Sequence, residues 1–310
     1  MACGIRGLGN VTSRKKRHHT VPRCYLQRFA SGRGKIWAFD KAENREFETS
    51  IRNAAAESGF YSVPLTGVPE SVARETDPDG IENALSDVEG DLADALGQIE
   101  RNAHYGVGID TNMQQRMAEH MMFLYIRTAG ARAMVEEAHQ KAFRRVIERA
   151  SAALGKEVPK DIVANPRALK LSHLRLLVDL DRLAKYAGVL LGHYWVVLTN
   201  PTGTPFVTSD CPVVRIRLAA LGSAGGDGIA SPGVRVALPI GGRTILVLFE
   251  RSMHEWAASL HLGCRPVNSL ASVTEYNTAQ VLGSKRHVFS GMSCTQFTGE
   301  VLRSRARSTA

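Results

Sequence analysis

The spacing of the apolar residues changes once along this chain, and that change limits the folds open to it. Between residues 81 and 99 they recur every three or four positions, which is the period of one helix face. After residue 193 the apolar residues gather in short runs, such as YWVVL at 194–198 and TILVLF at 244–249, as they do in strands. Helices in the middle and strands toward both ends predict an α+β fold. We expect a central helical bundle, an N-terminal β-hairpin and a C-terminal, mostly antiparallel sheet.

The same patterns predict the individual elements. Helices are expected at 80–102, at 112–154 with a kink at Gly130, at 166–191 and at 268–282, after a short first helix that Pro22 opens. Strands 35–40 and 45–49 would form the N-terminal hairpin. Strands 194–198 and 206–208 would form a second hairpin across the Asn-Pro-Thr-Gly turn at 200–203. Further strands are expected at 213–218, 234–238, 244–249 and 288–289.

Residues 18–290 are expected to form a single domain, with its helical part at about 80–192 and its strand-rich part at about 193–290. Residues 1–17 read as a disordered basic arm and 291–310 as a tail. The formal charge of +9 is concentrated in these ends, in a basic run at 14–17 and in Arg303, Arg305 and Arg307. Such ends favour nucleic acid or another polyanion as partner, and they equally suit plain solvated tails.

No window of the sequence is apolar enough for a transmembrane helix or a signal peptide, so no membrane partner is expected. The five cysteines are scattered and form no Cys-x-x-Cys pair, which argues against a zinc knuckle or a disulfide framework. We interpret them as reduced thiols of a cytoplasmic protein. The oligomeric state is left open.

Several segments, in order, resemble an uncharacterised bacterial family, domain of unknown function 4238. They are HHTVPRCYLQRF at 18–29, KIWAFD at 35–40, GFY at 59–61, Arg127-Thr128 with Arg132, FVTSDCP at 206–212, ALPI at 237–240 and Asn277. The chain departs from the family pattern at Cys211, where Asn is usual, and at Ala129, where Pro often follows Arg-Thr. The resemblance implies no established activity. It does add Tyr25 and Asn277 to the candidate substrate-binding residues.

The adjacent pair His18 and His19 is the most informative polar feature. Imidazole is both a common metal ligand and the acid–base group of neutral pH, so the pair could bind a divalent metal ion or move protons. Neighbouring side chains diverge in a strand or a helix, but both could reach one ion from a loop. The alternative is that one histidine caps the following helix and the other extends the basic run.

Acidic and basic side chains on two helices could complete a site. Glu82 and Glu89 lie seven residues apart, on one helix face, and could act as metal ligands or as part of a solvated acidic face. Arg127 and Arg132 could hold an anionic substrate by forked hydrogen bonds. The basic stripe that includes Arg127 could equally hold the neighbouring helix through Glu82 or Glu89. Arg116, on the same stripe as Arg127, is expected to have a structural role between helices.

Ser209 and Asp210 follow a strand and precede Pro212, which stops strand pairing. Such a strand end often projects a side chain into a cleft, so both residues are candidate catalytic groups. Ser209 lacks a Gly-x-Ser-x-Gly elbow, and Asp210 could equally cap its own turn.

Together these residues suggest a hydrolase, with a divalent metal as candidate cofactor, that acts on a phosphodiester or another anionic substrate. A nucleic-acid-binding protein without catalysis and an enzyme that modifies a small metabolite or peptide are the alternatives. The hydrolase hypothesis predicts that His18 or His19, Arg127 and Asp210 converge on one pocket.

Overall fold

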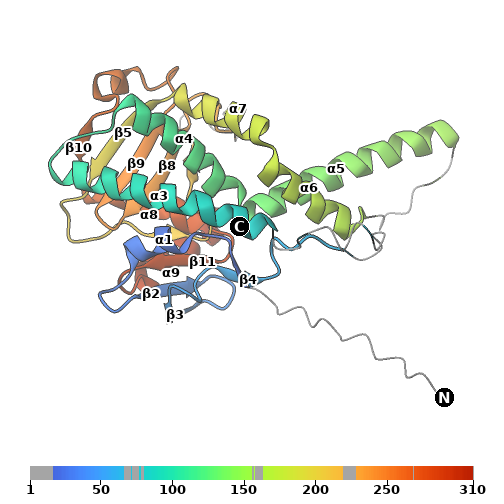
Figure 1. The fold of residues 1–310 in the computed structure, drawn as a ribbon, viewed down its shortest axis with the longest axis horizontal. Coiled ribbons are helices and arrows are strands. Elements are labelled where there is room, and N and C mark those ends of the chain that lie inside the picture. The colour runs from blue at the N-terminus through green and yellow to red at the C-terminus, as the bar shows by residue number, and fades with distance from the viewer. Residues whose placement is uncertain are drawn as a thin grey trace, which may run out of the picture.

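The structure is a computed structural model that describes residues 17–65, 71, 77, 80–155, 157, 163–218, 228–267 and 269–309. The expected basic arm therefore lies outside the described residues, except for Arg17, which begins strand β1. The fold is α+β, as the sequence predicts, with a helical layer, a five-stranded sheet and a smaller four-stranded sheet (Figure 1). No described helix is long and apolar enough to span a membrane.

The N-terminal region combines short strands with one turn of helix. Its elements are β1 (Arg17–His19), α1 (Arg23–Leu26), η1 (Gln27–Phe29), β2 (Lys35–Asp40), β3 (Arg45–Ser50) and β4 (Ala56–Ser58). Strand β1 pairs antiparallel with β4, and β2 with β3, which confirms the N-terminal hairpin. The four-stranded sheet is completed from the far end of the sequence, in the order β3-β2-β11-β6, by β11 (His287–Ser290) and β6 (Thr208–Ser209).

The helices described after β4 and before β5 are α3 (Gly80–His104), α4 (Thr111–Ile126), α5 (Ala129–Leu154), α6 (Pro166–Val178) and α7 (Leu180–Leu191). The sequence predicted α4 with α5, and α6 with α7, as two continuous helices, and both predictions were wrong. The Thr128 side chain accepts the N–H of Ala131, and that of Asp179 accepts the N–H of Arg182. Each side chain caps the N-terminus of a new helix, so it fixes a break rather than a kink.

The larger sheet has the order β10-β5-β9-β8-β7, with β5 (Tyr194–Thr199), β7 (Val214–Ile216), β8 (Arg235–Gly241), β9 (Thr244–Phe249) and β10 (Cys264–Pro266). Among the strand pairs that the structure describes in this sheet, β10-β5 is parallel and the others are antiparallel. The hairpin expected between 194–198 and 206–208 does not form. Strand β5 pairs with β9 and β10, whereas β6 joins the other sheet through β11.

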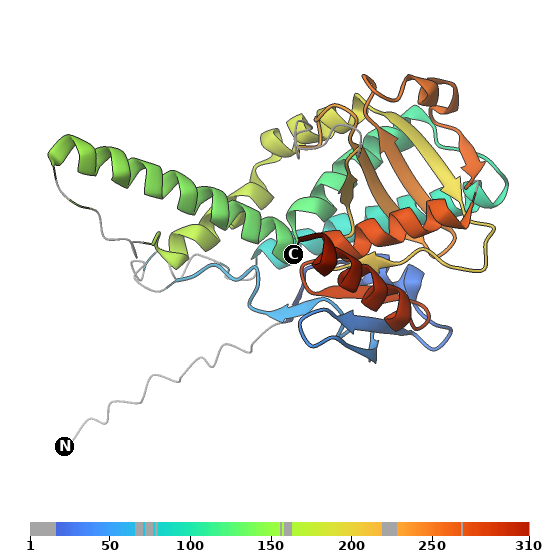
Figure 2. The ribbon, with the colours of Figure 1, turned by 180° about the vertical axis from the view of Figure 1, so that it is seen from behind.

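Helices cover both faces of the larger sheet. Helices α3 and α4 cross one face (Figure 1), and α8 (Leu270–Gly283) lies across the other (Figure 2). The expected tail at 291–310 contains α9 (Thr295–Thr309), which packs Phe297, Val301 and Leu302 against a small core around Val281 and Val288. The tail prediction therefore fails, because those three apolar residues give this arginine-rich segment an inner face.

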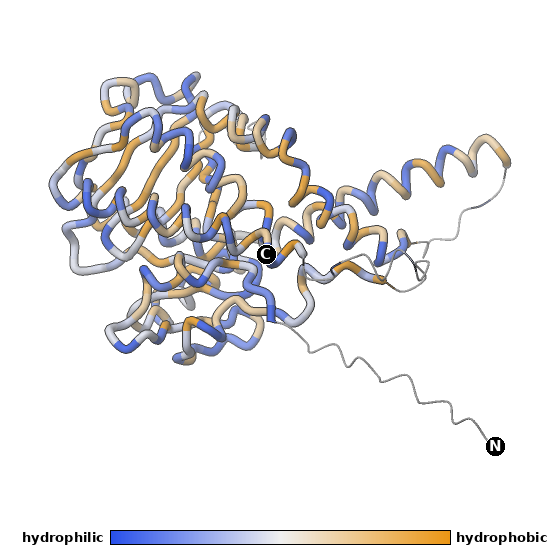
Figure 3. The backbone as a smooth tube through the Cα atoms, in the orientation of Figure 1, coloured by the Kyte–Doolittle hydropathy of each residue, from blue (hydrophilic) through white to orange (hydrophobic). Residues whose placement is uncertain are grey.

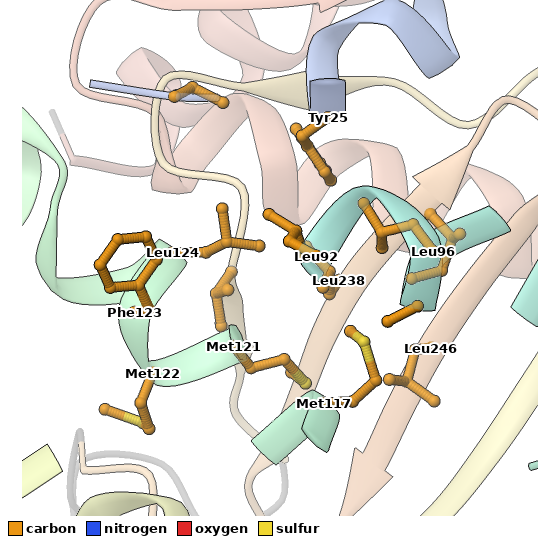
Figure 4. Packing of buried hydrophobic residues seen from close by; sticks show 14 of the residues in the cluster. Tyr25, Leu92, Leu96, Met117, Met121, Met122, Phe123, Leu124, Leu238 and Leu246 are labelled. Carbon is orange, nitrogen blue, oxygen red and sulfur yellow. The ribbon is translucent and has the colours of Figure 1, made fainter. Parts of the chain in front are cut away.

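The main core lies between the helices and the larger sheet. Leu92 and Leu96 of α3 meet Met117 and Met121 of α4 above Leu246 and other strand residues (Figure 4). These methionines therefore fill the core between the two helices and the sheet. Apolar colour is concentrated along the buried strands, while the outer half of α5, which extends beyond the body, alternates in hydropathy (Figure 3).

Candidate active site

Five residues gather where β1, α3 and the end of α4 meet, and we call them the His–Arg cluster: His18, His19, Tyr61, Glu89 and Arg127. Strand β1 and its partner β4 bring His18 beside Tyr61, while the apolar stripe of α3 sets the direction of Glu89. Residues far apart in the sequence are therefore brought together by β1, the 59–61 segment, α3 and the end of α4.

His18 is fully buried and lies against Tyr61. Its Nδ1 accepts the backbone N–H of Tyr61 at 2.7 Å, and the two rings stack with centroids 5.7 Å apart. Because Nδ1 accepts a hydrogen bond, the neutral ring carries its proton on Nε2. The first histidine therefore helps to position the 59–61 segment.

His19 faces the other side of the strand and is half-buried. Its Nε2 lies 3.1 Å from the carbonyl oxygen of Arg52, and only a donating Nε2–H can make that bond. The neutral ring therefore carries its lone pair on Nδ1. Burial lowers the pKa of His19, although the Arg52 carbonyl and nearby Glu89 oppose this, so the ring is neutral at pH 7.

Arg127 occupies the C-cap position of α4 and is fully buried. Its Nη2 donates to the carbonyl of His19 at 2.6 Å and pairs with Glu89 at 2.9 Å. Burial acts to lower the pKa of Arg127, but Tyr61 and Glu89 outweigh it and raise that pKa. Arg127 Nε and Nη1 find no hydrogen-bond partner among the residues that the structure describes. The guanidinium thus holds both the backbone of His19 and the carboxylate of Glu89 in place.

Glu89 and Glu82 lie on the same face of α3, as their spacing predicts. The Glu89 side chain remains 23% exposed while its Oε1 meets Arg127, so one part of it faces solvent. Glu82 lies close enough to Tyr61 to affect its ionisation, and burial, as the main cause, raises the pKa of Tyr61 to about 12. Arg116 pairs instead with Asp91 and Asp94 of α3 and holds the two helices together.

Arg132 supports the His–Arg cluster from α5. Its Nη2 donates to the Phe60 carbonyl at 2.7 Å, its guanidinium lies 3.5 Å over the Phe60 ring, and its Nε donates to His173 Nδ1. His173 in turn donates from Nε2 to the carbonyl of Ile126, and burial lowers the pKa of His173 to about 4. These contacts hold the 59–61 segment, so the donors of Arg132 are directed at the protein itself.

Of the four candidate metal ligands, His18 and Glu82 lie near Tyr61, while His19 and Glu89 lie near Arg127. His18 offers no lone pair, because its Nδ1 accepts the Tyr61 N–H and its Nε2 carries the proton, whereas His19 keeps the lone pair of Nδ1. In the described parts of the chain, no three His, Cys, Asp or Glu side chains form a group that could hold a metal ion. These donors therefore do not fit a preformed metal centre.

The other candidates form a second group, the strand-end cluster: Ser209, Asp210, Asn277, Gln280 and the backbone of 285–287. The carboxylate of Asp210 accepts the N–H groups of Lys285, Arg286 and His287 at 2.7–2.9 Å. The buried Ser209 hydroxyl donates to Gln280 Oε1 at 2.8 Å, and no base lies among its described hydrogen-bond partners. Asp210 thus caps the turn between α8 and β11.

Asn277 and Tyr25 are likewise paired with the chain itself. Asn277 accepts the Val207 N–H and donates to the Pro205 carbonyl, both at 2.9 Å. The Tyr25 hydroxyl donates to the Pro239 carbonyl at 2.7 Å and accepts from Thr208. Both side chains are buried and connect β6, with the residues just before it, to neighbouring elements. This geometry indicates structural roles for them.

The predicted convergence is met only in part. His19 and Arg127 touch, whereas the hydrogen bonds of Asp210 go to 285–287 and share no residue with the His–Arg cluster. The two clusters approach each other through Cys211, since a Cβ on Gly130 would lie 2.5 Å from its Sγ. Sequence reasoning gave no role to Tyr61, although the Gly-Phe-Tyr segment that contains it was part of the resemblance.

The fold and the His–Arg cluster define an α+β protein with a buried histidine–arginine junction between a short strand and a helical layer. The chain belongs to the family described as "Protein of unknown function (DUF4238)", whose model matches residues 17–293. No curated protein and no solved structure matches the chain.

Proposed function

We propose that the chain is a hydrolase for an anionic substrate, with its acid–base site at His19. The observation that carries the proposal is the hydrogen bond from His19 Nε2–H to the Arg52 carbonyl, which leaves the Nδ1 lone pair on a half-buried ring. A neutral imidazole with a fixed tautomer is the usual form of a general base. None of the candidate residues of the strand-end cluster combines exposure with an uncommitted basic atom.

The proposed reaction needs three groups. His19 Nδ1 takes a proton from water as the water oxygen attacks the substrate, and the leaving group departs with its bonding electrons and receives that proton from the imidazolium. Glu89, held by Arg127, stabilises the imidazolium while it exists. Arg23, exposed at the start of α1 and electrostatically coupled to His19, supplies a cation that a substrate anion could reach.

The test compares the hydrolysis rates of His19→Gln and of the unaltered protein, both full-length, with bis(p-nitrophenyl) phosphate, p-nitrophenyl phosphate and p-nitrophenyl acetate as substrates. Glutamine keeps an N–H donor for the Arg52 carbonyl but has no base. We expect a loss of about 10²–10⁴ in kcat. The matched control, His139→Gln on the exposed face of α5, should keep its rate. No hydrolysis of any of the three by the unaltered protein, or equal rates for His19→Gln, would refute the proposal.

The same assay separates the alternatives that the sequence leaves open. If a divalent metal is the cofactor, EDTA should abolish activity and added Mn²⁺ or Mg²⁺ should restore it; if side chains suffice, EDTA should change nothing. Hydrolysis of the acetate but neither phosphate would indicate a metabolite or peptide substrate.

The cysteines that the structure describes carry free thiols, and we propose a cytoplasmic location on that basis.

A second candidate, nucleic-acid binding, rests on helix α9. Its apolar residues pack inward, and the side chains of Arg303, Arg305 and Arg307 are exposed. We propose that these arginines neutralise phosphates of the backbone. Replacing all three by Gln should reduce the salt dependence of binding to a 20-base-pair duplex by about 0.9 for each phosphate that the helix no longer neutralises. An unchanged slope, or no binding by the full chain at low salt, would exclude this role of α9.

A further inference from the structure

Helix α8 crosses one face of the larger sheet (Figure 2). A cavity of about 480 Å³ opens on that face. Strands β5, β8, β9 and β10, the 3-10 helix η3 (Glu255–Leu260) and α8 all contribute to its walls. None of the residues that line it belongs to the His–Arg cluster or to the strand-end cluster. Its volume lies within the range of small-molecule sites.

The floor of the cavity is apolar and its wall is aromatic. Val196 and Leu198 of β5 and Phe249 of β9 form part of the floor, and Tyr276 of α8 joins the wall. Trp256 is 59% exposed, although its ring is anchored edge-on to Phe249 with centroids 5.0 Å apart. An exposed tryptophan fixed at the edge of an apolar hollow offers a flat surface to a planar ring.

The charged residues of the lining favour an anion. Arg235 is held by Glu275 through paired hydrogen bonds, one of them 3.0 Å long, so these two charges offset each other. Arg265 on β10 is exposed, and its Nη1 donates to the carbonyl of its own neighbour, Cys264, at 3.1 Å rather than to a carboxylate. One positive charge therefore remains in excess at the end of the cavity formed by β10.

We propose that this cavity binds a small planar aromatic molecule with an acidic group, such as a nucleoside monophosphate or an aromatic carboxylate. The ring lies on the apolar floor beside Trp256, and the acid group pairs with the guanidinium of Arg265, which can form two parallel hydrogen bonds to a carboxylate or phosphate. The proposal is independent of the hydrolase activity, because the two sites share no residue.

Intrinsic fluorescence and calorimetry on the full chain test the proposal. Of the three tryptophans, Trp195 is fully buried and Trp37 lies on β2 of the smaller sheet, so AMP in the cavity should change the emission of Trp256 first, while calorimetry follows the indole probes, which fluoresce themselves. The probes are AMP and indole-3-carboxylate, their neutral counterparts adenosine and indole, and octanoate as an anion without a ring. We expect at least one aromatic anion to bind tighter than about 1 mM and more than tenfold tighter than its neutral counterpart and than octanoate.

Two exposed substitutions locate the ligand. Arg265→Met should weaken the aromatic anion about tenfold or more and leave its neutral counterpart within twofold. Trp256→Ala should weaken both about tenfold and remove the fluorescence change. Arg149→Met, on the exposed side of α5, is the matched control and should bind as the unaltered protein does.

The competing outcomes overturn the proposal. Calorimetry that detects neither AMP nor indole-3-carboxylate at millimolar concentration would refute it. So would binding that Arg265→Met and Trp256→Ala leave unchanged while both variants melt at the temperature of the unaltered protein. Binding of AMP alone would assign the site to nucleotides, and binding of indole-3-carboxylate alone would assign it to aromatic acids.

Discussion

The His–Arg cluster and the strand-end cluster contain similar residues but use them differently. In the strand-end cluster, Asp210 accepts three backbone N–H groups and Ser209 donates to a neighbouring amide, so both are satisfied by the fold. In the His–Arg cluster, a buried cation holds a carboxylate that remains 23% exposed beside a half-buried histidine. A polar residue in a family signature is therefore a catalytic candidate only if the fold leaves one of its polar atoms without a hydrogen-bond partner.

The sharpest test of that difference is Asp210→Ala. Three N–H groups around a side chain that is only 7% exposed would lose their acceptor. We expect the free energy of unfolding to fall by about 4 kcal/mol, measured by urea denaturation. Asp210→Asn should lose about half as much unfolding free energy. Asp87→Ala, on the exposed face of α3, is the control, and its unfolding free energy should stay within about 0.5 kcal/mol of that of the unaltered protein. A loss below about 1 kcal/mol for Asp210→Ala would show that the strand end is not held by this carboxylate.

Arg127→Met should have the next largest effect. It removes a fully buried guanidinium and leaves Glu89 and the His19 carbonyl without it, which we expect to cost about 3 kcal/mol of unfolding free energy. Arg116→Met is the matched control on the same helix, because its partners Asp91 and Asp94 are 54% and 65% exposed. That control should lose less than about 1 kcal/mol. Equal losses for the two variants would contradict the distinction between a buried and a surface ion pair.

As the pH falls, the surroundings of the His–Arg cluster should lose stability before those of the strand-end cluster. The folded-state pKa of His173 is about 4, below its ordinary 6.5, so the unfolded chain binds the proton first. The contribution of His173 to stability is complete above pH 6.5 and is lost toward pH 4, by about 3 kcal/mol at that pH. The side chain of Arg286 holds the pKa of Asp40 at about 2, so the Asp40–Arg286 pair beside the strand end persists until the pH falls through that value.

Hydrogen exchange measured between pH 6.5 and 4 checks this order. Protection of the Tyr61 amide should fall across the range, while that of the Arg286 and His287 amides should follow only the global stability. His173→Gln should have a flatter dependence of unfolding free energy on pH than the unaltered chain. Parallel loss of protection at both places would mean that the regions open as one unit.

The sequence predicted element types well where one period continued for several turns, as in α3. It failed where a single side chain redirects the backbone: Thr128 and Asp179 each cap a new helix inside a run that reads as continuous. The strand at 206–208 was paired with the wrong neighbour, because local spacing carries no information on β11, which lies 79 residues beyond β6.

The grouping of the His–Arg cluster was predicted in part, but the contacts of its members were not. The apolar stripes of α3 and α4 set the directions of Glu89 and Arg127, whereas no pattern in the sequence predicted strand β1, which places His18 and His19. What could not be predicted was the partner of each polar atom, since most partners are backbone groups, such as the Arg52 carbonyl and the Tyr61 N–H. Backbone groups have no sequence signature, so only the fold reveals which side chains they occupy.

The approach of Gly130 to Cys211 gives the molecule a natural chemical reporter. Burial raises the pKa of the Cys211 thiol to about 11, and the chain at Gly130 is too close to admit even a methyl group between them. Cys211 is half-buried and lines a cavity together with Tyr125 and Met134, so an alkylating reagent can reach the sulfur, while its raised pKa keeps the reaction slow at neutral pH. Its labelling rate should rise steeply with pH and would report any change in packing between the start of α5 and the end of β6.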